Sequence, residues 1–171
     1  MIKKLLLFVI AGVILASSNV MAQSTVEDKD FNFSIFLTSD WSQTKVEKTS
    51  KNDAVSYSYD NLDGNNALMI LAFKVNGKKE LDDLIYNVEK DMNLDIPKRS
   101  GDYNYDDYGS YERKKGSYID EEFVETVYYF TTENEGMENY AYVVRFITVA
   151  STYNDDMAKK IDEIARSFKP L

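Results

Sequence analysis

The sequence predicts an α+β fold organised around a central pair of antiparallel strands. The densest run of β-branched and aromatic residues, Tyr118 to Ala150, contains two strand-like segments, 123–131 and 139–150, joined by a polar turn over 132–138. Both alternating faces of the second segment are apolar, so we expect it to lie mid-sheet, covered on both sides. Two segments with helical spacing of apolar residues, 81–92 and 154–168, supply the helical part of the fold.

The N-terminus predicts a secretory signal peptide over residues 1–22. Lys3 and Lys4 precede an apolar run, 5–16, that is too short to span a bilayer comfortably. Small side chains lead up to Ala22, so we expect cleavage after Ala22 and a mature chain that begins at Gln23. The protein would then be periplasmic or secreted, and the alternative is an uncleaved membrane anchor.

The negative net charge of the chain argues against some classes of binding partner. The net charge of −9 becomes −11 once Lys3 and Lys4 are removed with the signal peptide. Phosphate backbones and anionic lipids repel such a surface, which argues against nucleic acid binding and against membrane binding after cleavage. An acidic surface suits a basic protein partner. The chain has no cysteine, so the fold must depend on its hydrophobic core.

The first half of the expected single domain, 31–171, is rich in strands. Residues 23–30 are polar, and we expect them to form a flexible lead-in. Trp41, the only tryptophan, follows a turn at 38–40 and is expected to be a buried core residue. Alternation of apolar residues predicts strands over 31–37, from Trp41 through Val46, over 54–59 and over 67–75.

The second half begins with the helix over 81–92, which Pro97 separates from the next strand. Residues 100–109 are polar, acidic and rich in tyrosine, and they predict a loop or an irregular sheet edge. A strand over 110–119 follows, with Lys115-Gly116 as an expected bulge or kink. Asn154 is a suitable N-cap for the last helix, whose buried stripe comprises Met157, Ile161, Ile164, Ala165 and Phe168.

The composition argues against an enzyme. The chain has no histidine and no cysteine, which excludes Ser-His and Cys-His nucleophiles and zinc sites of the usual ligand types. Ser42 and Lys45 match an S-x-x-K motif, but a strand would point their side chains apart. Paired carboxylates can hydrolyse glycosides, yet those that crowd at one turn suit solubility better: Asp120, Glu121, Glu122 and Glu125.

Two acidic segments match part of the EF-hand pattern of calcium-binding loops. Gly64 stands where an EF-hand loop places its glycine, but the first and last ligand positions of that register are Tyr59 and Ile70. Asp102, Asn104 and Asp106 occupy the first, third and fifth positions of a second register, without its glycine or its closing glutamate. Weak binding of a hard cation and a solvated acidic loop both remain open there, and no cofactor is expected.

Tyrosine indicates a binding surface. Nine of the thirteen tyrosines lie between Tyr103 and Tyr142, and tyrosine interleaved with Asp and Asn is typical of sugar-binding and protein-binding surfaces. For Tyr128, Tyr140 and Tyr142 the strand propensity of tyrosine is the better explanation. For the tyrosines in the polar segment, strand propensity and a binding surface explain the sequence equally well. The residues predicted to bind a partner are Tyr103, Tyr105, Asp106, Asp107 and Tyr108.

The order of elements over 31–168 carries a recognisable set of core positions: Phe33, Ile35, Trp41, the stripe 81–88, Tyr128-Tyr129, Ile164 and Phe168. In this order and these residues the chain resembles the PsbP-like family, which includes the extrinsic PsbP protein of the oxygen-evolving complex, the Ran-binding Mog-type import factors and small bacterial envelope proteins. The resemblance implies an α/β/α sandwich, in which an antiparallel sheet of about six to seven strands has helices packed on both faces. It also implies a non-catalytic role in binding or assembly, with no metal or partner site carried over.

Together these features predict an exported, non-catalytic binding or assembly protein of the cell envelope that recognises a protein partner. The alternative is a carbohydrate- or calcium-binding module, and a hydrolase is less favoured.

Overall fold

The computed structural model describes residues 24–77, 80–92, 94–107, 111–132 and 138–171. The predicted signal peptide, 1–22, lies outside these residues, as does most of the turn expected over 132–138.

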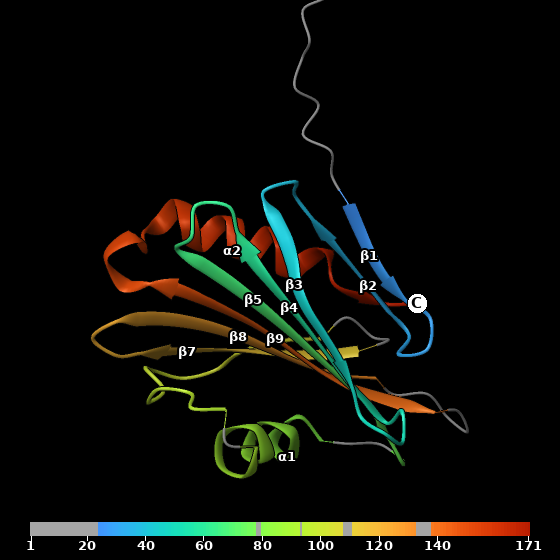
Figure 1. Cartoon of the computed structure of the whole chain (residues 1–171). Helices are drawn as coiled ribbons and strands as arrows, with labels where there is room; N and C mark the ends of the chain where they lie inside the picture. The colour runs from blue at the N-terminus through green and yellow to red at the C-terminus, as the bar shows by residue number, and fades with distance from the viewer. Residues whose placement is uncertain (1–23, 78–79, 93, 108–110, 133–137) are drawn as a thin grey trace, which may run out of the picture.

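A seven-stranded sheet forms the body of the molecule (Figure 1). All its neighbouring strands are antiparallel, which confirms the predicted antiparallel sheet. The strand expected over 139–150 lies fourth of seven and is buried along nearly its whole length. In spatial order the strands are β3 (Trp41–Lys48), β4 (Ala54–Asn61), β5 (Asn66–Val75), β9 (Asn139–Val149), β8 (Phe123–Thr132), β7 (Tyr111–Ile119) and β6 (Asn104–Asp107).

A second, three-stranded sheet consists of β1 (Ser24–Asp28), β2 (Phe33–Leu37) and β10 (Lys169–Pro170). The expected flexible lead-in over 23–30 is therefore wrong, because β1 pairs with β2 along its length. The carboxylate of Asp28 accepts the backbone N–H groups of Asp30 at 2.9 Å and of Phe31 at 3.1 Å, which closes a tight turn. The sequence of β1 is mostly polar because most of its side chains face solvent.

One face of the large sheet packs against β2 and against α2 (Asp155–Ser167), which crosses it in Figure 1. Asn154 caps α2 as predicted, since its side chain accepts the N–H of Met157 at 3.0 Å. Phe168 ends the helix in the core, with its ring centroid 4.4 Å from that of Phe130. Alternate side chains of β9, including Tyr142 and Phe146, complete this cluster.

A contact between α2 and the strands fixes the helix on this face. Asp162 accepts hydrogen bonds from the Lys115 ammonium, at 2.7 Å, and from the Tyr128 hydroxyl. Burial alone would raise the pKa of Asp162, but these two hydrogen bonds and the lysine charge hold it below its ordinary value. The carboxylate therefore stays ionised in the folded protein.

α1 (Leu81–Tyr86) packs in a second core cluster with residues of β5, β8 and β9. The expected helix over 81–92 is in fact α1 followed by a π-helical turn, η1 (Asn87–Asp91), in which the Met92 N–H donates to the Asn87 carbonyl at 3.0 Å. The predicted apolar stripe is nevertheless buried: Leu81, Leu84, Ile85 and Val88 pack on Val127, Tyr129 and Val143. A short 3₁₀ turn, η2 (Ala150–Thr152), links β9 to α2.

A buried ion pair lies on the α1 side of the sheet. The Arg145 guanidinium on β9 donates two hydrogen bonds of 2.7 Å to the Glu125 carboxylate on β8. A third guanidinium N–H donates to the Leu94 carbonyl at 2.9 Å. The pair therefore ties the segment after α1 to the centre of the sheet.

The bulge expected at Lys115-Gly116 is absent, because Gly116 pairs in regular register with Val127. Glycine is required there for space: a Cβ would lie 2.9 Å from side-chain atoms of Tyr118 and 3.0 Å from the Tyr103 ring. A register shift occurs instead in β3, between Gln43 and Lys45.

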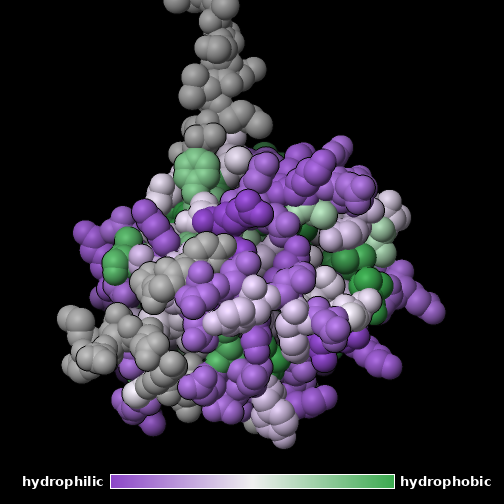
Figure 2. Space-filling model, turned by 180° about the vertical axis from the view of Figure 1, so that it is seen from behind, coloured by the Kyte–Doolittle hydropathy of each residue, from purple (hydrophilic) through white to green (hydrophobic). Residues whose placement is uncertain are grey.

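Side chains on the face seen in Figure 2 are mostly hydrophilic, and the apolar ones form small, separate groups. No helix within the described ranges has the length and apolar character needed to cross a bilayer. A recognition site on that face must therefore combine a few apolar side chains with polar neighbours.

Candidate functional site

The acidic, tyrosine-rich segment forms β6, the edge strand of the large sheet, which agrees with the sheet edge that was one of the two alternatives predicted for it. Tyr103, just before β6, faces inward, and its hydroxyl donates to the Glu89 carboxylate at 2.5 Å. Burial and this hydrogen bond raise the pKa of Tyr103 to about 12. Tyr103 therefore anchors the segment to η1, and little of it is available to a partner.

The other predicted binding residues of this segment have mixed roles. Tyr105 is 52% exposed. Asp106 pairs with the Arg113 guanidinium of β7, whose Nε lies 3.2 Å from Oδ2. Asp107 is exposed on the same strand, and Tyr108 lies outside the described residues. The structure thus brings Tyr105, Asp106 and Asp107 together on β6, but Asp106 is already engaged by an arginine.

The metal prediction at Asp102, Asn104 and Asp106 gains no support from the geometry. Among the described residues no three acidic side chains converge closely enough to hold a metal ion. Weak cation binding by this segment stays a prediction.

The residues of the two sequence patterns considered for catalysis lie on β3 and around the β7–β8 turn. Ser42 is exposed on the edge strand β3, and Lys45 pairs with Glu47 at 2.8 Å. The Asp120 carboxylate accepts the N–H groups of Glu122 and Phe123, at 2.8 and 2.7 Å, and so shapes the β7–β8 turn. Glu125, from the same turn-side cluster, is buried against Arg145.

A groove beside Trp41 has the mixed character that recognition needs. Trp41 is only half-buried, which corrects the expectation of a buried core residue, because one side of its ring packs edge-to-face on Phe146 while the residue lines the groove. The groove has a volume of about 410 Å³ and lies between α2 and two turns of the strands. This Trp41 groove is lined by Phe36, Thr38, Asp40, Trp41, Asn61, Asp63, Met157, Lys160, Ile161, Glu163 and Ile164.

The floor of the Trp41 groove is apolar. Phe36 and Trp41 come from the ends of β2 and β3, and the helix contributes Met157, Ile161 and Ile164. The helical residues recur at the spacing that places them on one side of α2. Next to the groove, Leu62 is 76% exposed, the largest exposure among the exposed apolar side chains of the described chain.

The rim of the Trp41 groove is predominantly acidic, with Asp40, Asp63 and Glu163 against Lys160. Asp40 accepts hydrogen bonds from the Thr38 hydroxyl and, at 3.0 Å, from the Asn61 amide. Burial alone would raise the pKa of Asp40, but these donors and the Lys160 charge lower it below its ordinary value. Asp40 therefore keeps its negative charge at neutral pH.

Backbone contacts hold the two turns of the groove together. The Leu62 N–H donates to the Asp40 carbonyl at 2.8 Å, and the Asp63 carboxylate accepts the Asn65 N–H at 2.7 Å. Gly64 adopts a φ of 72°, which favours glycine at the tip of the β4–β5 turn. The groove is thus preformed by fixed turns and a capped helix.

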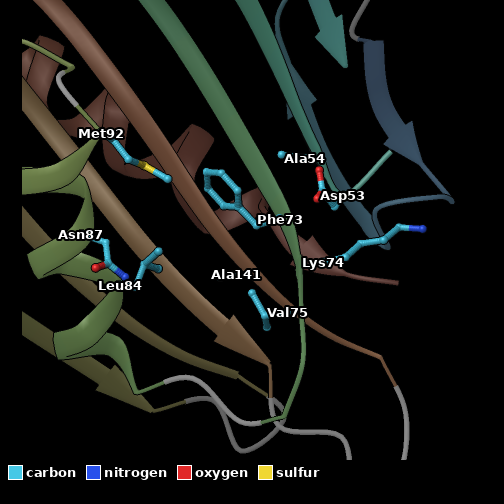
Figure 3. A pocket seen from close by; sticks show the side chains of 9 residues that line it. All are labelled: Asp53, Ala54, Phe73, Lys74, Val75, Leu84, Asn87, Met92 and Ala141. Carbon is cyan, nitrogen blue, oxygen red and sulfur yellow. The ribbon is translucent and has the colours of Figure 1, made fainter. Parts of the chain in front are cut away.

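A second hollow, of about 320 Å³, lies between α1 and the sheet (Figure 3). Leu84, Asn87 and Met92 face it from the helical side, while Phe73 and Val75 face it from β5. Its lining belongs largely to the apolar core beneath α1. It offers few polar groups that could orient a ligand, so the Trp41 groove is the stronger candidate.

Sequence reasoning missed the Trp41 groove apart from Trp41 itself. Its residues come from three segments, 36–41, 61–63 and 157–164, that are far apart in the chain. The one available signal was the pairing of a tryptophan with neighbouring Asp and Asn residues, which was interpreted as core and turn.

Comparisons with known proteins place the fold. No protein-family description matches the chain, and no curated protein matches it in sequence. The solution structure of cyanobacterial PsbP (CyanoP) from Synechocystis matches with a TM-score of 0.64 and 13% identity, over 91% of this chain and 96% of that one. A Mog1 mutant matches with a TM-score of 0.52 and 11% identity, over 88% and 97%. At such identities the likeness shows the fold alone, and the predicted PsbP-like fold is confirmed.

Proposed function

We propose that this chain with the PsbP-like fold is an exported, non-catalytic binding protein that recognises a protein partner through the Trp41 groove. The observation that carries the proposal is the combination of an apolar floor with a predominantly acidic rim in one preformed groove. The proposal also includes the α/β/α sandwich, in which helices pack on both faces of the sheet, because α1 and α2 belong to different core clusters.

The groove defines the chemistry of its occupant. Burying an aliphatic side chain on Trp41, Met157 and Ile164 is favourable by about 25 cal/mol for each Å² of apolar surface removed from water. A lysine or arginine beside that side chain would meet the carboxylates of the rim through charge-assisted hydrogen bonds. The partner segment is therefore basic and apolar in alternation, in agreement with the acidic composition of the chain.

Several observations support a role without catalysis. The chain has no histidine or cysteine to act as a base or a nucleophile. Lys45, of the S-x-x-K motif, is engaged by Glu47, and Glu125 is engaged by Arg145. Export is supported by the predicted signal peptide over 1–22.

Because Trp41 is the single tryptophan of the chain, its fluorescence reports directly on binding in the groove. Trp41 fluorescence is titrated with a short peptide of alternating lysine and leucine, and with a control peptide of alternating glutamate and leucine. We expect a saturable change with the basic peptide alone, weakening as salt is raised. No response to the basic peptide, or an equal response to both peptides, would remove the proposal.

A matched pair of charge variants locates the contact. Glu163→Gln removes a rim carboxylate, and Asp107→Asn removes a carboxylate on β6, so both change the net charge equally. We expect Glu163→Gln to weaken peptide binding by about two- to fivefold and Asp107→Asn to leave it unchanged. The reverse pattern would place recognition on β6, as the sequence predicted.

A carbohydrate is the second candidate for the same groove. The Trp41 ring lies beside Asn61 and Asp63, and an aromatic face flanked by planar polar groups also suits a sugar. A neutral oligosaccharide that changes Trp41 fluorescence without salt dependence would favour this function over a basic peptide.

A further inference from the structure

A cationic pocket lies on the α1 side of the sheet, apart from the Trp41 groove. Lys90, Lys98 and Arg99 line it together with Glu89 and Tyr118, around a volume of about 410 Å³. Three cations against one carboxylate give it a positive charge on a chain whose net charge is −9. Such a local excess is unexpected from composition alone and calls for an anionic ligand.

The backbone holds two of these cations rigidly. Lys98 and Ser100 flank Arg99 in an extended segment that pairs with the end of β7: the Ile119 N–H donates to the Lys98 carbonyl at 3.3 Å, and the Ser100 N–H donates to the Ser117 carbonyl at 2.7 Å. This segment extends the sheet edge beyond β6. Lys98 and Arg99 therefore lie on a segment that is hydrogen-bonded to β7.

Arg99 is oriented by its surroundings. Its guanidinium carbon lies 4.2 Å from the centroid of the Tyr103 ring, and Nη1 donates to the Gly101 carbonyl at 2.6 Å. Gly101 has a φ of 80°, which turns the chain back beneath the guanidinium. An arginine has five N–H donors, so this arrangement leaves several for a ligand.

Glu89, the one carboxylate among the described residues that line the pocket, already accepts two hydrogen bonds at one of its oxygens. Glu89 accepts hydrogen bonds from the hydroxyls of Tyr103, at 2.5 Å, and Tyr118, at 2.7 Å, and Nε of Arg99 lies 3.9 Å away. Lys90 and Lys98 have no ion-pair partner within the described part of the chain. Their charges are therefore available to an incoming anion.

The π-helical turn η1 is a second observation that points to function. A π turn inserts a residue into a helix, and such turns are rare and occur frequently at functional sites. Glu89 and Lys90 lie in η1, and both line the pocket. The irregularity thus coincides with the residues that form the charged wall.

We propose that this pocket binds a small organic anion through a carboxylate or phosphate group. Arg99 supplies a planar fork that matches either group, and Lys90 and Lys98 supply point charges. Ile96 and Pro97 form an apolar wall, which suits a carbon skeleton better than a bare ion. The pocket shares no lining residue with the Trp41 groove, so the result for one site does not decide the proposal for the other.

Calorimetric titration of the mature chain with inorganic phosphate and, separately, with succinate tests the proposal. Sodium chloride at matched ionic strength is the control for general screening. We expect saturable binding of at least one anion, and the preferred one identifies the ligand as a phosphate or a carboxylate. Absence of saturable binding by both anions would overturn the proposal.

Charge variants locate the bound anion. Lys90→Gln combined with Lys98→Gln should weaken binding at least about tenfold, since the anion loses two charge-assisted hydrogen bonds. Lys51→Gln combined with Lys159→Gln, at two exposed lysines outside the pocket, is the matched control and should bind as the unaltered protein does. Equal affinity of the pocket variant and the control would show that the pocket is not the binding site.

Discussion

Replacing Glu125 by glutamine tests the buried ion pair that joins β8, β9 and the segment after α1. The side chains of Arg145 and Glu125 are only 7% and 4% exposed, and two hydrogen bonds of 2.7 Å join them. Removing one charge leaves the other buried without compensation, which typically costs about 3 to 5 kcal/mol. For a chain of 171 residues, a loss of that size lowers the melting temperature by roughly 6 to 20 °C.

Urea denaturation followed by circular dichroism measures this loss, with the exposed neighbour change Glu121→Gln as the control. The combined change Glu125→Leu with Arg145→Met should recover most of the stability, because it removes both charges. It should still fall short by about 1 to 3 kcal/mol, since the Leu94 carbonyl loses its donor. A loss below about 1 kcal/mol for Glu125→Gln would show that water reaches the pair, and the reasoning would fail.

Three further predictions concern stability and export. Because the folded pKa of Asp162 lies below its ordinary value of 3.8, its contribution to stability is complete above about pH 4 and is lost as the pH falls through the folded pKa. Denaturation of Asp162→Asn and of the unaltered protein should therefore differ at neutral pH and converge in acid; a constant difference would contradict this. Trp41→Ala should cost about 1.5 to 3 kcal/mol, less than the 3 to 5 typical of a fully buried tryptophan, and an unchanged urea midpoint would show that the ring contributes nothing to packing. Intact mass of the exported protein should match a chain that begins at Gln23, whereas retention of residues 5–16 would disprove cleavage.

The central strand β9 could be predicted from the sequence because most of its positions are buried and apolar on both faces. Tyr142 and Phe146 pack on one face, and Ala141 and Val143 pack on the other. The edge strand β1 could not be predicted, since a strand that buries few side chains carries no apolar alternation. Its pairing with β2 depends on the turn at Asp28, which is a local signal of low specificity.

The Trp41 groove was largely hidden from sequence reasoning because it is assembled over long distances in the chain. The Trp41 groove joins the segment before Trp41, the turn at Asp63 and the helix at Ile164. The π turn was missed because Val88 and Met92 continue the helical spacing of the stripe, so the irregularity leaves no mark on the pattern. The segment at β6 was correctly predicted to be polar, and part of it is exposed. Tyr103 was predicted to bind a partner, but its hydroxyl is hydrogen-bonded to Glu89.

Site-specific photo-crosslinking in the native cell tests the central claim most directly. A photoreactive residue replaces Lys160 on the rim of the Trp41 groove, and in a separate variant it replaces Tyr105 on β6. Mass spectrometry then identifies the crosslinked peptide. The account predicts adducts at position 160 and not at 105, on a partner segment in which lysine or arginine alternates with aliphatic residues. Adducts at position 105 alone, or a crosslinked segment that is acidic, would contradict it.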